Sequence, residues 1–153
     1  MGLKQYAVAA ALAVVVLGLT GCESEEEREA EKELGSAADL TTCLADATAA
    51  PTPYPDGFPA HWPFPPDTTV FAAEDRGDDG IVVSAVTGSS LDEVLDFLNG
   101  DVVDAGYQVT SGETEEHDAE AGWSGNDHHG RWAIRESAAC PGEVTLQVLS
   151  TND

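Results

Sequence analysis

Histidines and carboxylates in the second half of the chain are the residues best suited to bind a metal. His117 is followed by Asp118, and His128 and His129 directly follow Asp127. Imidazole and carboxylate together suit zinc or copper, and a hairpin between the two groups would bring them together. The other interpretation is a solvated polar turn, because adjacent histidines on a turn point in different directions. The alternative function that we carry forward is therefore a metal or cation site formed by His117, Asp127, His128 and His129.

The residue patterns of nucleophilic catalysis are absent from the sequence. No serine lies in a Gly-x-Ser-x-Gly elbow or a Ser-x-x-Lys frame, and there is no Walker loop or dinucleotide fingerprint. With 29 acidic residues, any pair of carboxylates is uninformative. Asp75, Asp78 and Asp79 surround two glycines but lack the alternating oxygen ligands and terminal Glu of an EF-hand. We therefore expect neither an enzyme nor a bound cofactor, with a hydrolase kept as a third hypothesis.

The charge balance excludes whole classes of partner. Six Lys plus Arg stand against 29 Asp plus Glu, which gives a net charge of −23 over 153 residues. A protein that neutralises phosphates needs the opposite balance, so we expect no nucleic-acid partner. The same deficit of cations argues against a polybasic reader of membrane surfaces. A protein or a cationic envelope component is the partner that this charge favours.

The N-terminal segment carries the clearest motif. A single early cation, Lys4, precedes an unbroken small and apolar stretch, Ala7–Leu19, which is too short to span roughly 30 Å of hydrocarbon comfortably. Such a stretch is typical of the h-region of a signal peptide. It runs into Leu19-Thr20-Gly21-Cys22, which resembles the lipobox of bacterial lipoproteins. The resemblance implies cleavage between Gly21 and Cys22 and attachment of a diacylglyceryl group to the Cys22 thiol.

This resemblance implies a lipid-anchored protein on the extracytoplasmic face of a cell membrane. Two acyl chains, at about 0.8 kcal/mol per buried methylene, make a durable anchor. An uncleaved membrane helix and an ordinary signal peptide with a chance cysteine are the alternatives. Myristoylation is excluded because Tyr6 stands where that motif needs Ser or Thr. The composition, rich in Ala, Asp, Gly and Val and nearly free of Lys, resembles that of secreted proteins of high-GC actinobacteria.

Residues 22–39 are expected to form an acidic tether behind the anchor. Cleavage removes Lys4 and no acid, so five cations then face 29 acids and the net charge becomes −24. Like charges stand four residues apart, as at Glu25 and Glu29, which is mildly repulsive in a helix. Leu34 is the one large apolar side chain, so we expect a solvated tether of on the order of 20–24 Å. A docking helix for a partner is the alternative, although no apolar stripe supports it.

Cys43 and Cys140 remain once Cys22 is assigned to the lipid. An extracytoplasmic location permits disulfides, and an even pair of leftover cysteines favours one bond. A Cys43–Cys140 bond would join the segment before the core to the loop before the last strand. Closing a loop near 100 residues is worth about 4.7 kcal/mol in the chain-entropy model. A catalytic cysteine is the alternative, but there is no Cys-x-x-Cys motif and no neighbouring histidine.

A Pro-rich run interleaved with aromatic residues precedes the core. All prolines but Pro141 fall between Pro51 and Pro66, and proline fixes φ and removes a donor, so the run is extended. We expect a rigid wrap whose rings pack on the sheet, the alternative being a ligand for aromatic grooves or a binding strip. The run loosely resembles the Pro-rich lead-in of many bacterial lipoproteins, which implies no activity. Residues 40–49, just before it, predict a short helix.

One helix is the most clearly marked element. Ser90 and Glu93 have the spacing of a capping box, and the apolar spacing that follows predicts a helix from Leu91 to Ala105 with a break at Asn99-Gly100. Strands are expected at residues 68–73, 81–86, 107–109, from 123, at 131–136 and at 144–148. Residues 111–122 are expected as an acidic loop or a ragged strand edge. Trp123 and Trp132 are expected in the core, with a sugar or peptide site as the alternative.

Together these elements predict an α+β fold. We expect a small antiparallel sheet of about five strands, in the order ββ-α-β-β-β, with one main helix packed on one face. The element order resembles the small sheet-and-helix modules of bacterial envelope lipoproteins. The predicted organisation is a signal peptide (1–21), a lipidated cysteine and tether (22–39) and a single α+β domain (40–153). The function that we favour is a non-enzymatic binding or assembly module with an envelope protein as its partner.

Overall fold

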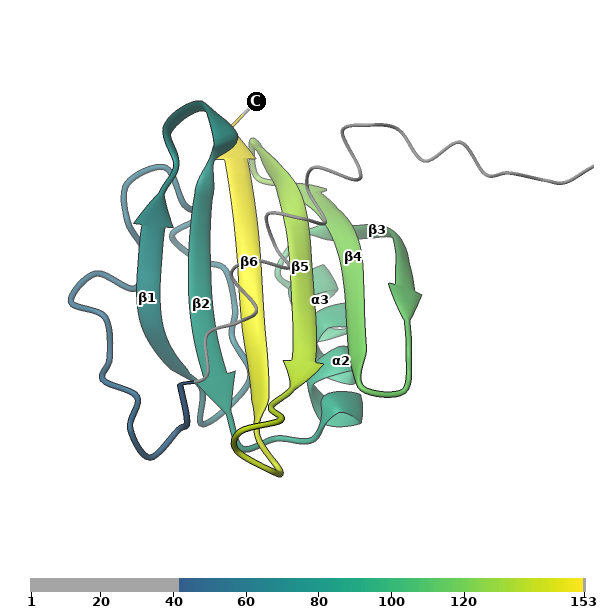
Figure 1. The fold of residues 1–153 in the computed structure, drawn as a ribbon. Coiled ribbons are helices and arrows are strands. Elements are labelled where there is room, and N and C mark those ends of the chain that lie inside the picture. Colours follow the sequence, from purple (N-terminus) through teal and green to yellow (C-terminus); the bar gives the residue numbers. More distant parts are fainter. Residues whose placement is uncertain (1–41, 153) are drawn as a thin grey trace, which may run out of the picture.

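Six strands and one interrupted helix build the fold in the computed structural model, which describes residues 42–152. The sheet is antiparallel throughout, and one face carries the helix (Figure 1). The predicted α+β class is confirmed, with six strands rather than about five. In chain order the elements are β1 (Thr69–Asp75), a 3-10 turn (Gly77–Asp79), β2 (Ile81–Thr87), α2 (Leu91–Asn99), α3 (Asp101–Asp104), β3 (Gln108–Thr114), β4 (Asp118–Gly125), β5 (His128–Glu136) and β6 (Val144–Asn152).

The spatial order of the strands is β1-β2-β6-β5-β4-β3. The last strand therefore lies at the centre, between β2 and β5, and the two halves of the chain meet along it (Figure 1). β2 is buried along its whole length, so its side chains are buried on both faces of the sheet. The ladder pairs Ser84 with Gln147 on β6, and Gln147 in turn lies opposite Ala133 of β5.

The acidic run after the helix forms a hairpin, where the sequence left open a loop or a ragged strand edge. β3 extends to Thr114 and β4 begins at Asp118, with the turn closed by a 2.8 Å bond from the Glu115 amide to the Asp118 carbonyl. Alternate β4 residues, Ala119 and Ala121, point into the core. Glu120, between them, and Asp118 take the opposite face, so the acids do not prevent strand formation.

The helix begins and breaks at the predicted residues. The Ser90 amide donates to Glu93 Oε2 (2.9 Å) and the Glu93 amide donates to Ser90 Oγ (3.4 Å), which completes the capping box. α2 ends at Asn99 and α3 begins at Asp101, so the break at Gly100 is confirmed. Gly106, with φ of 96°, ends the helix in a conformation that favours glycine.

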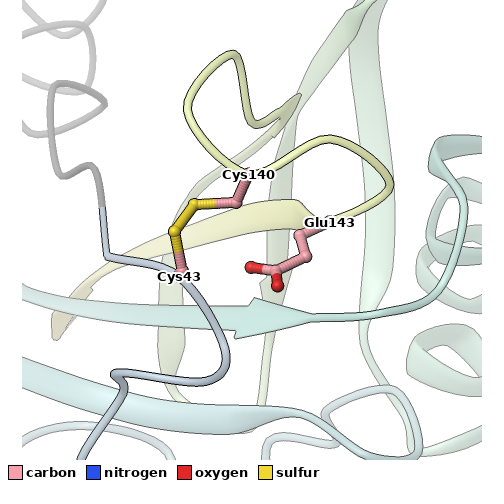
Figure 2. A group of neighbouring side chains, drawn as sticks. All are labelled: Cys43, Cys140 and Glu143. Carbon is pink, nitrogen blue, oxygen red and sulfur yellow. A yellow bond between two sulfur atoms is a disulfide. The ribbon is translucent and has the colours of Figure 1, made fainter.

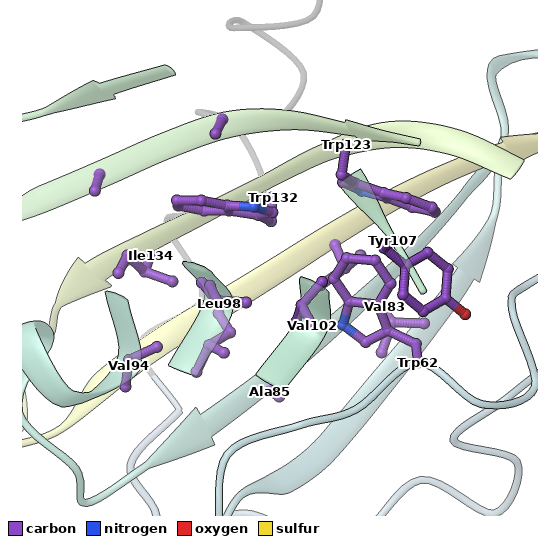
Figure 3. Packing of buried hydrophobic residues seen from close by; sticks show 14 of the residues in the cluster. Trp62, Val83, Ala85, Val94, Leu98, Val102, Tyr107, Trp123, Trp132 and Ile134 are labelled. Atoms are coloured by element: carbon purple, nitrogen blue, oxygen red, sulfur yellow. The ribbon is translucent and has the colours of Figure 1, made fainter. Parts of the chain in front are cut away.

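Aromatic rings form the centre of the core between sheet and helix (Figure 3). Trp62 lies 4.4 Å from Trp123 and 4.9 Å from Tyr107, measured between ring centroids. Trp123 and Trp132 are both buried, as predicted for core residues. The contacts that these three tryptophans make within residues 42–152 are packing contacts, and their indole N–H groups form no hydrogen bond there.

The Pro-rich segment is a wrap over the same face, as predicted, because its rings Phe58 and Trp62 are buried in this core. The short helix expected at 40–49 was wrong for the residues described: only a turn at 44–46 is present. Backbone donors there pair elsewhere, the Leu44 amide with Glu143 Oε2 and the Ala50 amide with the Val70 carbonyl. These long-range bonds replace the ones a helix would make.

Candidate functional site

The predicted lipidation site lies outside the described residues. Cys22 and the Gly21–Cys22 bond belong to the segment before Thr42. In the part of the chain that is described, no helix is long and apolar enough to cross a membrane.

The disulfide between Cys43 and Cys140 is present, as the sequence predicted (Figure 2). The two Cα atoms are 5.6 Å apart and the bond closes a sequence separation of 97. Two further bonds hold the same junction: Glu143 Oε2 accepts from the Leu44 amide (2.7 Å), and Ser137 Oγ accepts from the Cys140 amide (3.1 Å). The first described residues are thereby fastened to the loop between β5 and β6.

Glu143 and the two cysteines also form a compact set of metal-type ligands. Their ligand atoms lie within 4.8 Å of one another, and within residues 42–152 this is the one such group of three or more. Both sulfurs are, however, joined to each other (Figure 2). A cysteine binds a metal as its thiolate, and sulfurs joined in a disulfide are not thiolates. In the oxidised protein this set therefore has a structural role.

The structure does not bring the predicted histidines together. His117 precedes β4 at one end of the β4–β5 hairpin, whereas Asp127 lies in the turn at the other end and His128 is the first residue of β5 after that turn. Eight residues of strand at about 3.3 Å each separate the two ends by roughly 20–25 Å. His117 Nδ1 instead contacts Glu136 Oε2 at 2.9 Å, and His128 Nδ1 contacts Ser150 Oγ at 3.2 Å. The four residues therefore do not share one site within a molecule.

The turn between β1 and β2 lies beside an acidic cavity of about 310 Å³. Asp56, Asp75 and Asp78 line it, together with Ser150 and Asn152 of β6. Asp75 Oδ1 already accepts from the Gly77 amide at 2.8 Å. Among the described residues, the carboxylates of this cavity do not form a group of three or more neighbouring metal ligands.

A second cavity of about 310 Å³ opens beside β1 and is lined by apolar and aromatic groups, with Tyr54 and Phe64 about 6.0 Å apart between ring centroids. Tyr54 Oη donates to the Trp62 carbonyl at 3.0 Å. Burial raises the pKa of Tyr54, and Coulombic interaction with Tyr107 adds to the shift. Tyr54 nevertheless keeps 38% of its surface exposed, and Val103 on α3 is the other large apolar side chain exposed among the described residues. We call this cavity the Tyr54 pocket.

The Tyr54 pocket was not predicted as a distinct site. The sequence shows aromatic residues between prolines, but it does not show which ring is buried and which remains at the surface. Phe58 and Trp62 turn into the core, while Tyr54 stays at the rim. The one sequence feature that could have indicated this pocket was the tyrosine hydroxyl at position 54, because a ring with a polar end suits a position between the core and water.

Comparisons of this chain with protein-family models, with curated proteins and with solved structures find no match. The functional conclusion therefore depends on the residues themselves.

Proposed function

We propose that this protein is a lipid-anchored lipoprotein of the extracytoplasmic face of a cell membrane that binds a partner and catalyses no reaction. The observation that carries the proposal is the Cys43–Cys140 bond. It uses two of the three cysteines and suits an oxidising compartment. The cysteine that remains is Cys22, which follows an apolar h-region in a lipobox-like sequence.

The charge of the molecule restricts what it binds. After cleavage five cations face 29 acids, and a surface of this sign repels nucleic acids and anionic polymers. Binding to a protein, or to a cationic component of the envelope, is therefore favoured. The Tyr54 pocket is a concave site lined mainly by apolar groups, which is the form that binding sites commonly take.

The anchor is tested by detergent-phase partition of the full chain expressed in a bacterial host. We expect the protein to partition into the detergent phase, because two acyl chains dominate its affinity for micelles. Cys22→Ser should move the folded protein into the aqueous phase or leave the leader uncleaved. The matched control, Cys43→Ser with Cys140→Ser, keeps the anchor and should stay in the detergent phase. Equal partition of the wild type and of Cys22→Ser protein that has lost its leader would contradict the proposal.

The binding role is tested by affinity capture from detergent-solubilised envelopes at low salt. We expect one partner in stoichiometric amount, and we expect Tyr54→Ala to reduce its recovery by about tenfold, the effect of losing roughly 1.4 kcal/mol. Val103→Ala is the matched control, because it removes the other large exposed apolar side chain. Empty capture, or equal loss with both variants, would argue against binding at the Tyr54 pocket.

A further inference from the structure

The sheet face opposite the helix has an unexpected composition at its centre. The strands alternate, so that Val83 and Leu146 point to the core while Val82 and Gln147 point the other way. We call the centre of that second face the outer face. Its members carry no charge, in a chain with 29 acidic residues; they are Val82, Ser84, Ala133, Gln147 and Leu149.

The outer face is also buried. Val82, Ser84 and Gln147 are only 2%, 4% and 4% exposed. A side chain on one open face of a sheet keeps contact with water, so burial this complete requires a covering layer. The helix and the Pro-rich wrap lie behind the sheet in Figure 1 and pack on the core side. Within residues 42–152, no helix or loop crosses the centre of the outer face, so the covering layer comes from elsewhere.

One buried polar atom of the outer face, and one on its flank, have no hydrogen-bond partner. Gln147 Oε1 is an unpaired acceptor, although its Nε2 donates to Ser84 Oγ at 3.4 Å. Arg131 Nε is an unpaired donor, although its Nη2 pairs with Glu120 Oε1 at 2.6 Å. Buried polar groups are nearly always satisfied. An acceptor and a donor on neighbouring strands match the N–H and C=O groups of a chain passing over the sheet.

We propose that the outer face binds residues Leu34–Leu40 of this same chain. The chain enters the described domain at Cys43, which the disulfide and Glu143 hold beside the start of β6. Gln147 lies three residues further along β6 than Val144, or about 10 Å. An extended chain covers that distance in three or four residues, so the residues just before Cys43 are within reach.

The composition of that segment suits the face. Leu34–Leu40 reads LGSAADL, with two leucines, two alanines and one charge, Asp39. Arg131 and Arg135 of β5 flank the outer face, where they pair with Glu120 (2.6 Å) and Asp118 (3.5 Å), so docking would bring the single charge of Asp39 beside two existing ion pairs. Removing water from the charged side chains of the acidic run Glu23–Glu33 would cost more free energy. Because the segment is tethered, its effective concentration at the face is in the millimolar range, which lets weak contacts suffice.

The proposal changes the expected tether. The sequence alone predicts a solvated tether that extends to Asp39. If Leu34–Leu40 is docked, the solvated part ends near Glu33, and the docked residues cover the outer face. A partner would then bind elsewhere, as at the Tyr54 pocket. The docking of Leu34–Leu40 does not depend on whether Cys22 carries lipid.

Hydrogen–deuterium exchange of the full chain tests the docking. We expect amides of residues 35–41 to exchange at least tenfold more slowly than those of 24–32, in the wild type and in Cys22→Ser alike. Leu34→Asp with Leu40→Asp lies outside the described domain and should abolish the protection. Leu149→Lys, on the outer face, should do the same, while Val103→Lys on α3 should leave it intact. Near-ultraviolet circular dichroism of the buried tryptophans reports whether each variant keeps its fold.

Four results would overturn the proposal. The segment could exchange as fast as residues 24–32 in the wild type. Its protection could persist in folded Leu149→Lys, which would separate it from the outer face. Protection that is lost in Cys22→Ser would mean that lipid or detergent, and not the outer face, slows the exchange. Protection that grows with protein concentration would mean that a second copy of the chain covers the outer face.

Discussion

Ser90 and Glu93 cap the helix, and one of them titrates. Hydrogen bonds from the backbone and then the side chain of Ser90 lower the pKa of Glu93 below its ordinary value. A group whose pKa is lower in the folded state stabilises the fold above its unfolded pKa. That contribution is lost as the pH falls through the folded pKa.

Glu93→Gln should therefore reduce stability at neutral pH and weaken its decline in acid. Ser90→Ala should lower the free energy of unfolding by about 1 kcal/mol, the usual effect of losing a cap, and should remove the same acid dependence. Urea unfolding between pH 3 and 7 measures both. If Glu93→Gln and Ser90→Ala both kept the acid dependence of the wild type, the capping box would not be the source of that dependence.

Single residues also show where sequence reasoning succeeds. The cap, the helix break at Gly100 and the cysteine pair were all predictable, because each depends on local spacing or on counting. The partners of His117 and His128 were not predictable, because they depend on which end of a hairpin each residue occupies.

At the scale of elements, the disulfide joins the wrap to the sheet. The bond spans 97 residues, so its removal frees nearly the whole domain in the unfolded state. We expect Cys43→Ser with Cys140→Ser to lose about 4.7 kcal/mol in the chain-entropy model. Urea unfolding with and without reductant measures this. Reductant should destabilise the wild type and leave the double variant unchanged, and a wild type insensitive to reductant would contradict this role.

The elements that sequence reasoning missed were hidden by competing signals. Acidic residues in 113–120 obscured the alternation that places Ala119, Ala121 and Trp123 in the core. The expected helix at 40–49 failed because long-range bonds from Leu44 and Ala50 outweigh local propensity. In both cases tertiary contacts, which a single sequence does not show, decided the structure.

At the scale of the whole molecule, the two faces of the sheet have different roles in this account. One face carries the helix (Figure 1); the aromatic core and the wrap pack on that same face, and the Tyr54 pocket lies beside β1. The other is the outer face, which we assign to the chain's own Leu34–Leu40. The fold class followed from the sequence, but the central position of β6 did not, because the choice of strand partners depends on global packing.

Intact-mass spectrometry of the protein from native membranes shows directly whether Cys22 is lipidated. We expect a chain that begins at Cys22, carries a diacylglyceryl thioether there and retains the oxidised Cys43–Cys140 pair. A chain that still contains residues 1–21, with a free thiol at Cys22, would contradict the anchor, the topology and the choice of partner together.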